Sequence, residues 1–142
     1  MSQLQETASR TKTYRKGVIF REGDEANTMY VIRSGRVTIT KNLYGIMVKI
    51  ADLGPGDHFG EMALLEGGPR SASAIAETQV EADVYDSKTL AEHISAEPEF
   101  AFDMLRGLSR RLRMIDDRVT DLVAKGRLPQ EDAARLGHHT PC

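Results

Sequence analysis

The first 86 residues alternate short apolar runs with glycine-rich turns, a pattern typical of β-structure. Residues 17–20, 29–35 and 36–40 are rich in β-branched and aromatic side chains, which favour strands. A tight hairpin between residues 29–35 and 36–40 is predicted at Ser34-Gly35, because serine and glycine adopt turn conformations readily. We therefore expect a series of short strands joined by hairpins.

The same pattern continues to residue 85. Residues 42–45 predict a second hairpin turn, and residues 53–57, with two glycines and a proline, predict a third turn. Residues 72–76 and 80–85 alternate small or apolar side chains with polar ones, as strands with one buried face do. These two segments are expected to close a barrel.

The period of the pattern changes from two to that of a helix after the last predicted strand. Asp86 or Ser87 is suited to cap a short helix that extends to roughly His93. Pro98 is suited to the first turn of a second helix, which is expected to continue to about Ala124.

The second predicted helix carries apolar residues separated by three, four, three, four and three positions. This is the a/d spacing of a coiled coil, and charged residues lie between the apolar ones. We expect a homodimer along residues 105–122; the alternative is a helix packed on its own barrel. The arginines at 106–113 are interpreted as the polar flank of this helix, with a nucleic-acid footprint as the alternative. The stripe consists of Leu105, Leu108, Leu112, Ile115, Val119 and Leu122.

Length, composition and charge limit the number of domains and argue against several classes of protein. A chain of 142 residues with 40% hydrophobic residues is enough for one compact domain. The 19 basic and 21 acidic residues give a formal net charge of −2, so no overall basic field attracts nucleic acid. No apolar run approaches the ~20 residues that span a bilayer, and no signal segment follows Met1, so a cytoplasmic protein is expected. The single Cys142 excludes an internal disulfide, and the four histidines show no spacing that indicates a metal site.

The candidate chemistry is concentrated in residues 59–65 and 69–74, on either side of a Gly-Gly turn, which together predict a ligand-binding loop. Glu61, when ionised, accepts hydrogen bonds from hydroxyl groups, and Arg70 offers a planar set of donors that matches two phosphate oxygens. The small neighbouring residues allow the backbone to come close to a ligand. The alternative is a surface ion pair between Glu61 and Arg70, worth only ~0–1 kcal/mol.

This stretch resembles the phosphate-binding cassette of the cyclic-nucleotide-binding domain family, found in catabolite-activator-type regulators, cyclic-nucleotide-gated channels and cyclic-nucleotide-dependent kinases. The resemblance implies an eight-stranded β jelly roll, or double-stranded β-helix, followed by a short helix and a long capping and dimerisation helix. It implies that Glu61 holds the ribose 2′-hydroxyl, that Arg70 holds the cyclic phosphate, and that nearby amides and a hydroxyl complete the site. The residues assigned to the ligand by position are Phe59, Gly60, Glu61, Met62, Ala63, Arg70, Ser71, Ala72, Ile115 and Asp116.

The choice between cyclic AMP and cyclic GMP stays open in the sequence. In the family the capping helix contacts the base, often through hydroxyl side chains, and Ile115 and Asp116 lie at or near that place here. Asp116 is able to accept hydrogen bonds from either purine, and a hydroxyl at Ser71 is compatible with both. Cyclic AMP is favoured only because it is the more frequent ligand in the family. No cofactor is expected besides this ligand.

We expect residues 1–126 to form the cyclic-nucleotide-binding domain, with the barrel at about 11–86, the helices at about 87–125 and a polar tail at 127–142. No recognition helix fits the tail, so we expect a stand-alone sensor without a DNA-binding domain. The sensor would signal to an unidentified protein by moving its long helix. The alternatives are a ligand-free structural or oligomerising jelly roll and, third, a metal-dependent cupin-type enzyme, for which His58 with Glu61 is too small a ligand set.

Overall fold

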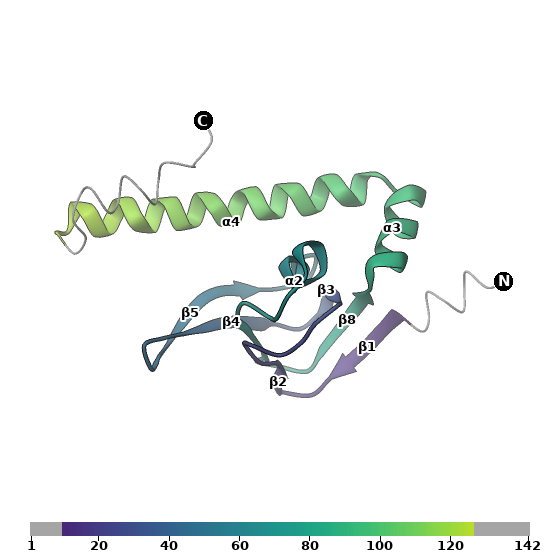
Figure 1. The fold of residues 1–142 in the computed structure, drawn as a ribbon, viewed down its shortest axis with the longest axis horizontal. Helices are drawn as coiled ribbons and strands as arrows, with labels where there is room; N and C mark the ends of the chain where they lie inside the picture. Colours follow the sequence, from purple (N-terminus) through teal and green to yellow (C-terminus); the bar gives the residue numbers. More distant parts are fainter. Residues whose placement is uncertain (1–9, 127–142) are drawn as a thin grey trace. The chain divides into compact units, whose positions relative to one another are not determined.

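The structure, a computed structural model, describes residues 10–126 (Figure 1). The chain divides into two compact units, of which the first ends at Glu97 and the second begins at Pro98. The strands and two short helices belong to the first unit, and one long helix forms the described part of the second.

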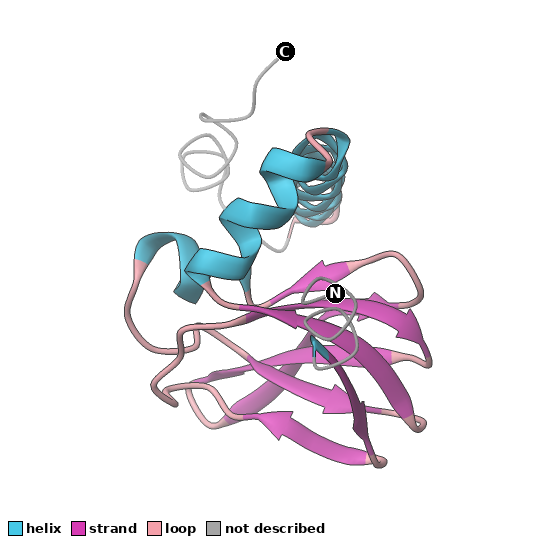
Figure 2. Cartoon of the chain, turned by 90° about the vertical axis from the view of Figure 1, so that its right-hand side faces the viewer, coloured by secondary structure: helices cyan, strands magenta, loops and turns pink. Residues whose placement is uncertain are grey.

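Eight strands, arranged in two antiparallel four-stranded sheets, make up most of the first unit (Figure 2). One sheet has the strand order β1-β8-β3-β6 and the other the order β2-β7-β4-β5, so strands distant in sequence lie side by side. This is the predicted eight-stranded jelly roll. The strands are β1 (Thr11–Tyr14), β2 (Gly17–Phe20), β3 (Met29–Ser34), β4 (Val37–Leu43), β5 (Ile46–Leu53), β6 (His58–Phe59), β7 (Ser73–Ala76) and β8 (Val80–Tyr85).

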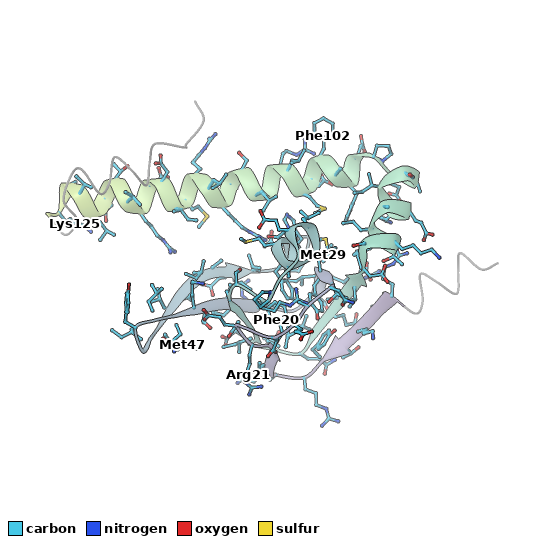
Figure 3. All side chains as sticks on the ribbon, in the orientation of Figure 1. Phe20, Arg21, Met29, Met47, Phe102 and Lys125 are labelled. Carbon is cyan, nitrogen blue, oxygen red and sulfur yellow. The ribbon has the colours of Figure 1, made fainter. Side chains whose placement is uncertain are left out.

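The hairpin predicted at Ser34-Gly35 is wrong: β3 and β4 belong to different sheets, so this turn carries the chain from one sheet to the other instead of joining paired strands. The turn between β4 and β5, in contrast, forms where the residue types predicted it. Asn42 accepts a hydrogen bond from the Gly45 amide at 2.7 Å, which closes the turn through a side chain. Tyr44 adopts a positive φ of 55° at the tip, and Gly45 follows with a φ of 86°. Apolar side chains of this hairpin, including Met47, are exposed to solvent (Figure 3).

The core of the first unit comes from the inward-facing positions of both sheets. Its largest fully buried side chains are those of Phe59, Met29, Ile32, Val37 and Val80. Burying an aliphatic or aromatic side chain of this size stabilises the fold by roughly 1.5–3 kcal/mol. Burial alternates at the start of β8, where Val80 and Ala82 are buried and Glu81 is exposed, whereas β3, β4 and β7 contain consecutive buried residues.

Two short helices belong to the same unit. The first, α2 (Glu61–Glu66), occupies part of the segment that was expected to be a loop, and its C-cap is Gly67. The second, α3 (Ser87–Ala96), starts after Asp86, which decides between the two predicted caps. Asp86 accepts from the Thr89 amide and its own amide donates to the Thr89 hydroxyl, both at 2.8 Å, so the two residues form a capping box.

The second unit contains α4 (Glu99–Ala124), which begins after Pro98 as the sequence predicted. Lys125 is its C-cap, and Gly126 follows with a φ of 73°, a conformation that ends helices. Among residues 10–126, none of the helices combines the length and the apolar composition that a bilayer crossing requires. The predicted polar tail at 127–142 lies outside the described residues.

The Asp86 cap gives a test of the fold. The hydrogen bonds from the Thr89 amide and hydroxyl lower the pKa of Asp86, so its stabilisation is present above the ordinary aspartate pKa and is lost as the pH falls through the lowered value. We expect Asp86→Ala to lower the free energy of unfolding by about 1 kcal/mol at neutral pH and by less in acid. Urea unfolding at several pH values measures this difference.

Asp103→Ala is the matched control, because the ion pair of Asp103 with Arg106 is largely exposed and contributes little. A loss for Asp86→Ala that matches the control, or that does not change with pH, would contradict the capping role.

Candidate ligand-binding site

The candidate site lies in residues 59–72, called the cassette below, which lead from β6 through α2 towards β7. Phe59 anchors its start: it pairs with Tyr30 across the β3–β6 ladder, and the two rings stack with their centroids 4.8 Å apart. Because this pair is buried in the core, the first residues of the cassette have a rigid base.

Gly60 is the turning point between β6 and α2. Its φ of 80° lies in the left-handed region, where a side chain is strained. A Cβ atom at this position would lie 2.7 Å from Nη1 of Arg70. Glycine is therefore required at residue 60 both for the turn and for the close approach of the arginine.

Arg70 is buried, with only 5% of its surface exposed. Its Nη1 donates to the carbonyls of Thr28 at 2.7 Å and Gly60 at 3.0 Å, and its Nη2 donates to the Thr28 hydroxyl at 3.0 Å. The guanidinium also lies over the Phe20 ring, 4.0 Å from its centroid. Phe20 lies among the side chains of the barrel (Figure 3). These contacts fix both the plane and the position of the cation.

The charge of Arg70 is set by opposing effects. Burial lowers the pKa of the guanidinium, while Tyr30 and the negative charges of Asp24 and Glu61 raise it. Arginine stays protonated under such conditions because its ordinary pKa lies far above neutral pH. The cassette therefore holds a buried, permanently charged guanidinium that interacts electrostatically with Glu61.

The backbone around Arg70 is tied to the loop between β2 and β3. The Gly23 amide donates to the Arg70 carbonyl, and the Arg70 amide donates to the Asp24 carbonyl, both at 2.8 Å. Pro69 forms an isolated bridge with Glu25 beside them. The arginine is thus held at its backbone as well as at its side chain.

Lys41 holds the next residue of the cassette, a contact that sequence reasoning did not predict. Its Nζ donates to the Ser71 carbonyl at 2.6 Å and lies 3.5 Å from the Glu22 carboxylate. Glu22 also accepts from the Asn42 amide at 3.0 Å, and this hydrogen bond and Lys41 lower the pKa of Glu22. The pairing of β4 with β7 brings Lys41 beside the cassette, and no local sequence pattern indicates that pairing.

Glu61 is the first residue of α2 and is as buried as Arg70, at 5% exposure. Its Oε1 lies 2.9 Å from Nδ1 of His58, which is also 5% exposed. The sequence raised a surface ion pair between Glu61 and Arg70 as an alternative; neither residue is at the surface. At the level of the sequence, His58 was considered only as a metal ligand. Its separation of three residues from Glu61 could have indicated that the two side chains are close enough to form a hydrogen bond.

The remaining cassette residues differ in exposure. Ala63 is buried in α2, Ala72 is half-buried, and Met62 and Ser71 are exposed. The Ser71 hydroxyl lies 3.7 Å from the Met62 sulfur, so the two segments of the cassette meet at this point. The first unit therefore holds eight of the ten predicted ligand residues: Phe59, Gly60, Glu61, Met62, Ala63, Arg70, Ser71 and Ala72.

The other two predicted ligand residues, Ile115 and Asp116, lie on α4 in the second unit. Ile115 is 51% exposed, and Asp116 is half-buried. Within residues 10–126, no group of three or more histidine, cysteine, aspartate or glutamate side chains is arranged to hold a metal ion. The first unit brings a buried guanidinium, that of Arg70, and a buried carboxyl group, that of Glu61, into one short segment.

Comparison with known proteins agrees with this arrangement. Residues 11–97 match the family described as the cyclic nucleotide-binding domain. The CRP-like cAMP-activated global transcriptional regulator of Mycobacterium tuberculosis is 37% identical over 74% of this chain and 47% of its own length. The cAMP-dependent protein kinase regulatory subunit of Schizosaccharomyces pombe is 30% identical over 80% of this chain and 26% of its own. The crystal structure of Thermus thermophilus catabolite activator protein has a TM-score of 0.68 and 27% identity, covering 96% of this chain and 76% of that one.

The chain thus spans half or less of the length of these two curated relatives. The matched residues 11–97 contain all eight strands, the whole cassette and α3. Several relatives carry cyclic AMP or cyclic GMP in their names, among them transcriptional regulators and protein kinase subunits. This chain belongs to the cyclic nucleotide-binding domain family.

Proposed function

We propose that this chain is a regulatory module that binds a cyclic mononucleotide in the cassette, with cyclic AMP preferred over cyclic GMP. One observation carries the proposal: Arg70 and Glu61, two charges of opposite sign, are both buried in the cassette and are held by separate partners. A guanidinium and a carboxylate fixed in one short segment are suited to a phosphate and a ribose hydroxyl, the two polar parts of a cyclic nucleotide.

In this proposal each end of the cassette takes one part of the ligand. Arg70 binds the cyclic phosphate, since a guanidinium matches two phosphate oxygens, and Glu61 accepts from the ribose 2′-hydroxyl. The amides of Met62 and Ala63, together with Ser71 and Ala72, complete the cradle. Phe59 and Gly60 contribute by fixing the backbone on which this cradle is built.

The base is proposed to contact Ile115 and Asp116 of α4. An aspartate accepts hydrogen bonds from either purine, so these residues do not select between the two ligands. The names of the mycobacterial and fission yeast relatives favour cyclic AMP. Competition between cyclic AMP and cyclic GMP for the protein measures the preference directly.

The proposed functional unit is residues 1–126, with α4 as the element that moves. If the nucleotide binds more tightly to one position of α4, binding shifts the population of that helix and changes the surface offered to a downstream protein. Identical hydrogen exchange along α4 with and without nucleotide would contradict this mechanism. The cytoplasmic location and the existence of a downstream protein partner stay predictions from the sequence.

Two other functions receive less support. A purely oligomerising jelly roll would use the exposed apolar positions of α4, but it gives the buried cassette charges no role. A cupin-type enzyme needs histidines and a glutamate grouped on strands, and the contact between His58 and Glu61 supplies too few ligands. We therefore propose a regulatory protein without catalytic activity.

A thermal-shift screen tests the three functions together. A ligand that binds only the folded state stabilises it by RT ln(1 + [L]/Kd), which is about 2.7 kcal/mol at one hundred times Kd. We expect cyclic AMP and, less strongly, cyclic GMP to raise the melting temperature, and linear AMP and divalent metals to leave it unchanged. No shift with either cyclic nucleotide at millimolar concentration would overturn the proposed function.

Substitutions at Arg70 and Ser71 test the assignment within the cassette. Arg70→Ala removes a buried charge-assisted contact and is expected to weaken cyclic AMP binding by ~2–5 kcal/mol. Ser71→Ala removes a neutral hydroxyl and should cost only ~0.5–1.5 kcal/mol. Titration calorimetry measures both, with thermal melts to confirm that each variant is folded.

Arg33→Ala is the control for the loss of a positive charge, because Arg33 lies at the surface beside Asp83 and outside the cassette. Its affinity should equal that of the unchanged protein. Equal small losses for Arg70→Ala and Ser71→Ala would show that Arg70 is not the anchor.

The proposed homodimer rests on the apolar stripe of α4, where Leu105, Leu112 and Ile115 are each more than half exposed. We expect a solution mass of twice the 15.7 kDa of one chain at micromolar concentration. Leu112→Asp should reduce the mass to that of a monomer, whereas Thr120→Asp adds the same charge outside the stripe and should leave it unchanged. Sedimentation equilibrium that gives one chain for the unchanged protein would contradict the dimer.

A further inference from the structure

We propose that His58 is a positioning residue for Glu61, through which the site selects ligands that carry a ribose 2′-hydroxyl. This inference rests on the proposed function, because it concerns how the glutamate meets the sugar. It starts from the contact between Nδ1 of His58 and Oε1 of Glu61 at 2.9 Å.

The fold brings these two residues together from different elements. His58 lies on the short strand β6, opposite Val31 of β3, so its backbone is fixed by the sheet. Gly60 then reverses the chain with its positive φ, and Glu61 begins α2 three residues after His58. The pair is therefore built by a strand, a glycine turn and a helix start, rather than by a flexible loop.

Because His58 and Glu61 are buried, losing the contact between them is costly. Both residues are 5% exposed, so water does not replace a lost partner easily. A buried carboxylate requires hydrogen-bond donors, and losing one is more costly than at the surface. His58 is a partner that holds the Glu61 carboxyl group in place.

The chemistry of the pair fixes the direction of the hydrogen bond. An ionised carboxylate only accepts, so Nδ1 of His58 has to carry the hydrogen. This bond restrains a side chain with several rotatable bonds and leaves it oriented before the ligand arrives. A pre-oriented acceptor binds a hydroxyl more tightly than a mobile one, because less freedom is lost on binding.

A merely structural histidine predicts a different result. If His58 only filled space under the cassette, its loss would weaken every nucleotide by the same factor. If it positions Glu61, its loss should weaken only those ligands that offer Glu61 a hydroxyl. The pair of ligands cyclic AMP and 2′-deoxy cyclic AMP separates the two cases, since they differ only in the group that Glu61 is proposed to bind.

The experiment measures the ratio of the two dissociation constants for several variants of the full chain. In the unchanged protein we expect cyclic AMP to bind more tightly by a factor on the order of ten or more, as for a hydrogen bond to a charged group. His58→Phe keeps a planar ring but removes the donor, so the ratio should fall towards one while 2′-deoxy cyclic AMP binds as before. His58→Asn supplies an amide near the position of Nδ1 and should keep most of the ratio.

Two further variants serve as controls. Glu61→Ala removes the acceptor and should abolish the discrimination, and adding His58→Phe to it should change the ratio no further, since both act through one contact. His93→Phe replaces a histidine of α3, whose ring lies against Tyr85 rather than Glu61, and should leave the ratio unchanged.

The outcomes are separable. An unchanged ratio in His58→Phe, or an equal loss for both ligands, would overturn the positioning role. If His58→Phe does not fold, a ratio near one for His58→Asn overturns it as well, and a retained ratio supports it. If the unchanged protein binds neither nucleotide, the proposed function itself fails, and this inference fails with it.

Discussion

The burial of one positive charge governs the structure around the cassette. Arg70 brings a guanidinium into the edge of the barrel, where leaving it without partners would cost several kcal/mol. The surrounding residues meet this demand: Thr28 and Gly60 accept its hydrogen bonds, and Phe20 covers one face. The glycine at residue 60, which allows the turn, also leaves room for the cation.

The same constraint explains why the cassette is tied down along its whole length. Phe59 is stacked in the core, the backbone of Arg70 is paired with the loop before β3, and Ser71 is held by Lys41. A site that binds a small anion gains affinity when its donors are fixed in advance, since less order has to be created on binding. The jelly roll provides that fixed frame, with two sheets contributing residues to one short segment.

Local chemistry made much of this predictable from the sequence. The strand periodicity, the turn at Asn42 to Gly45 and the cap at Asp86 each depend on residues close together in the chain, and the structure has them where the pattern indicated. The helical character of residues 61–66 was missed, because a segment of six residues is too short to show the 3.6-residue periodicity of a helix.

Contacts across the fold could not be predicted in the same way. The partners of Arg70 at Thr28 and of Ser71 at Lys41 depend on strand register, which a single sequence does not specify. The pairing of His58 with Glu61 is intermediate, since a separation of three residues suggests proximity but not shared burial. The resemblance to a family predicted which residues bind the ligand, and the structure shows which contacts hold those residues.

The contact of Lys41 with the cassette also has a mechanical consequence. Lys41 lies on β4, near the hairpin whose tip carries the fully exposed Tyr44, and the neighbouring Asn42 amide is bound to the same glutamate as the lysine. A shift of the Ser71 carbonyl should therefore move Lys41 and, through it, the hairpin formed by β4 and β5. Because the chain contains no tryptophan, a fluorescent probe attached at this tip would report movements of the Ser71 carbonyl without tryptophan emission in the background.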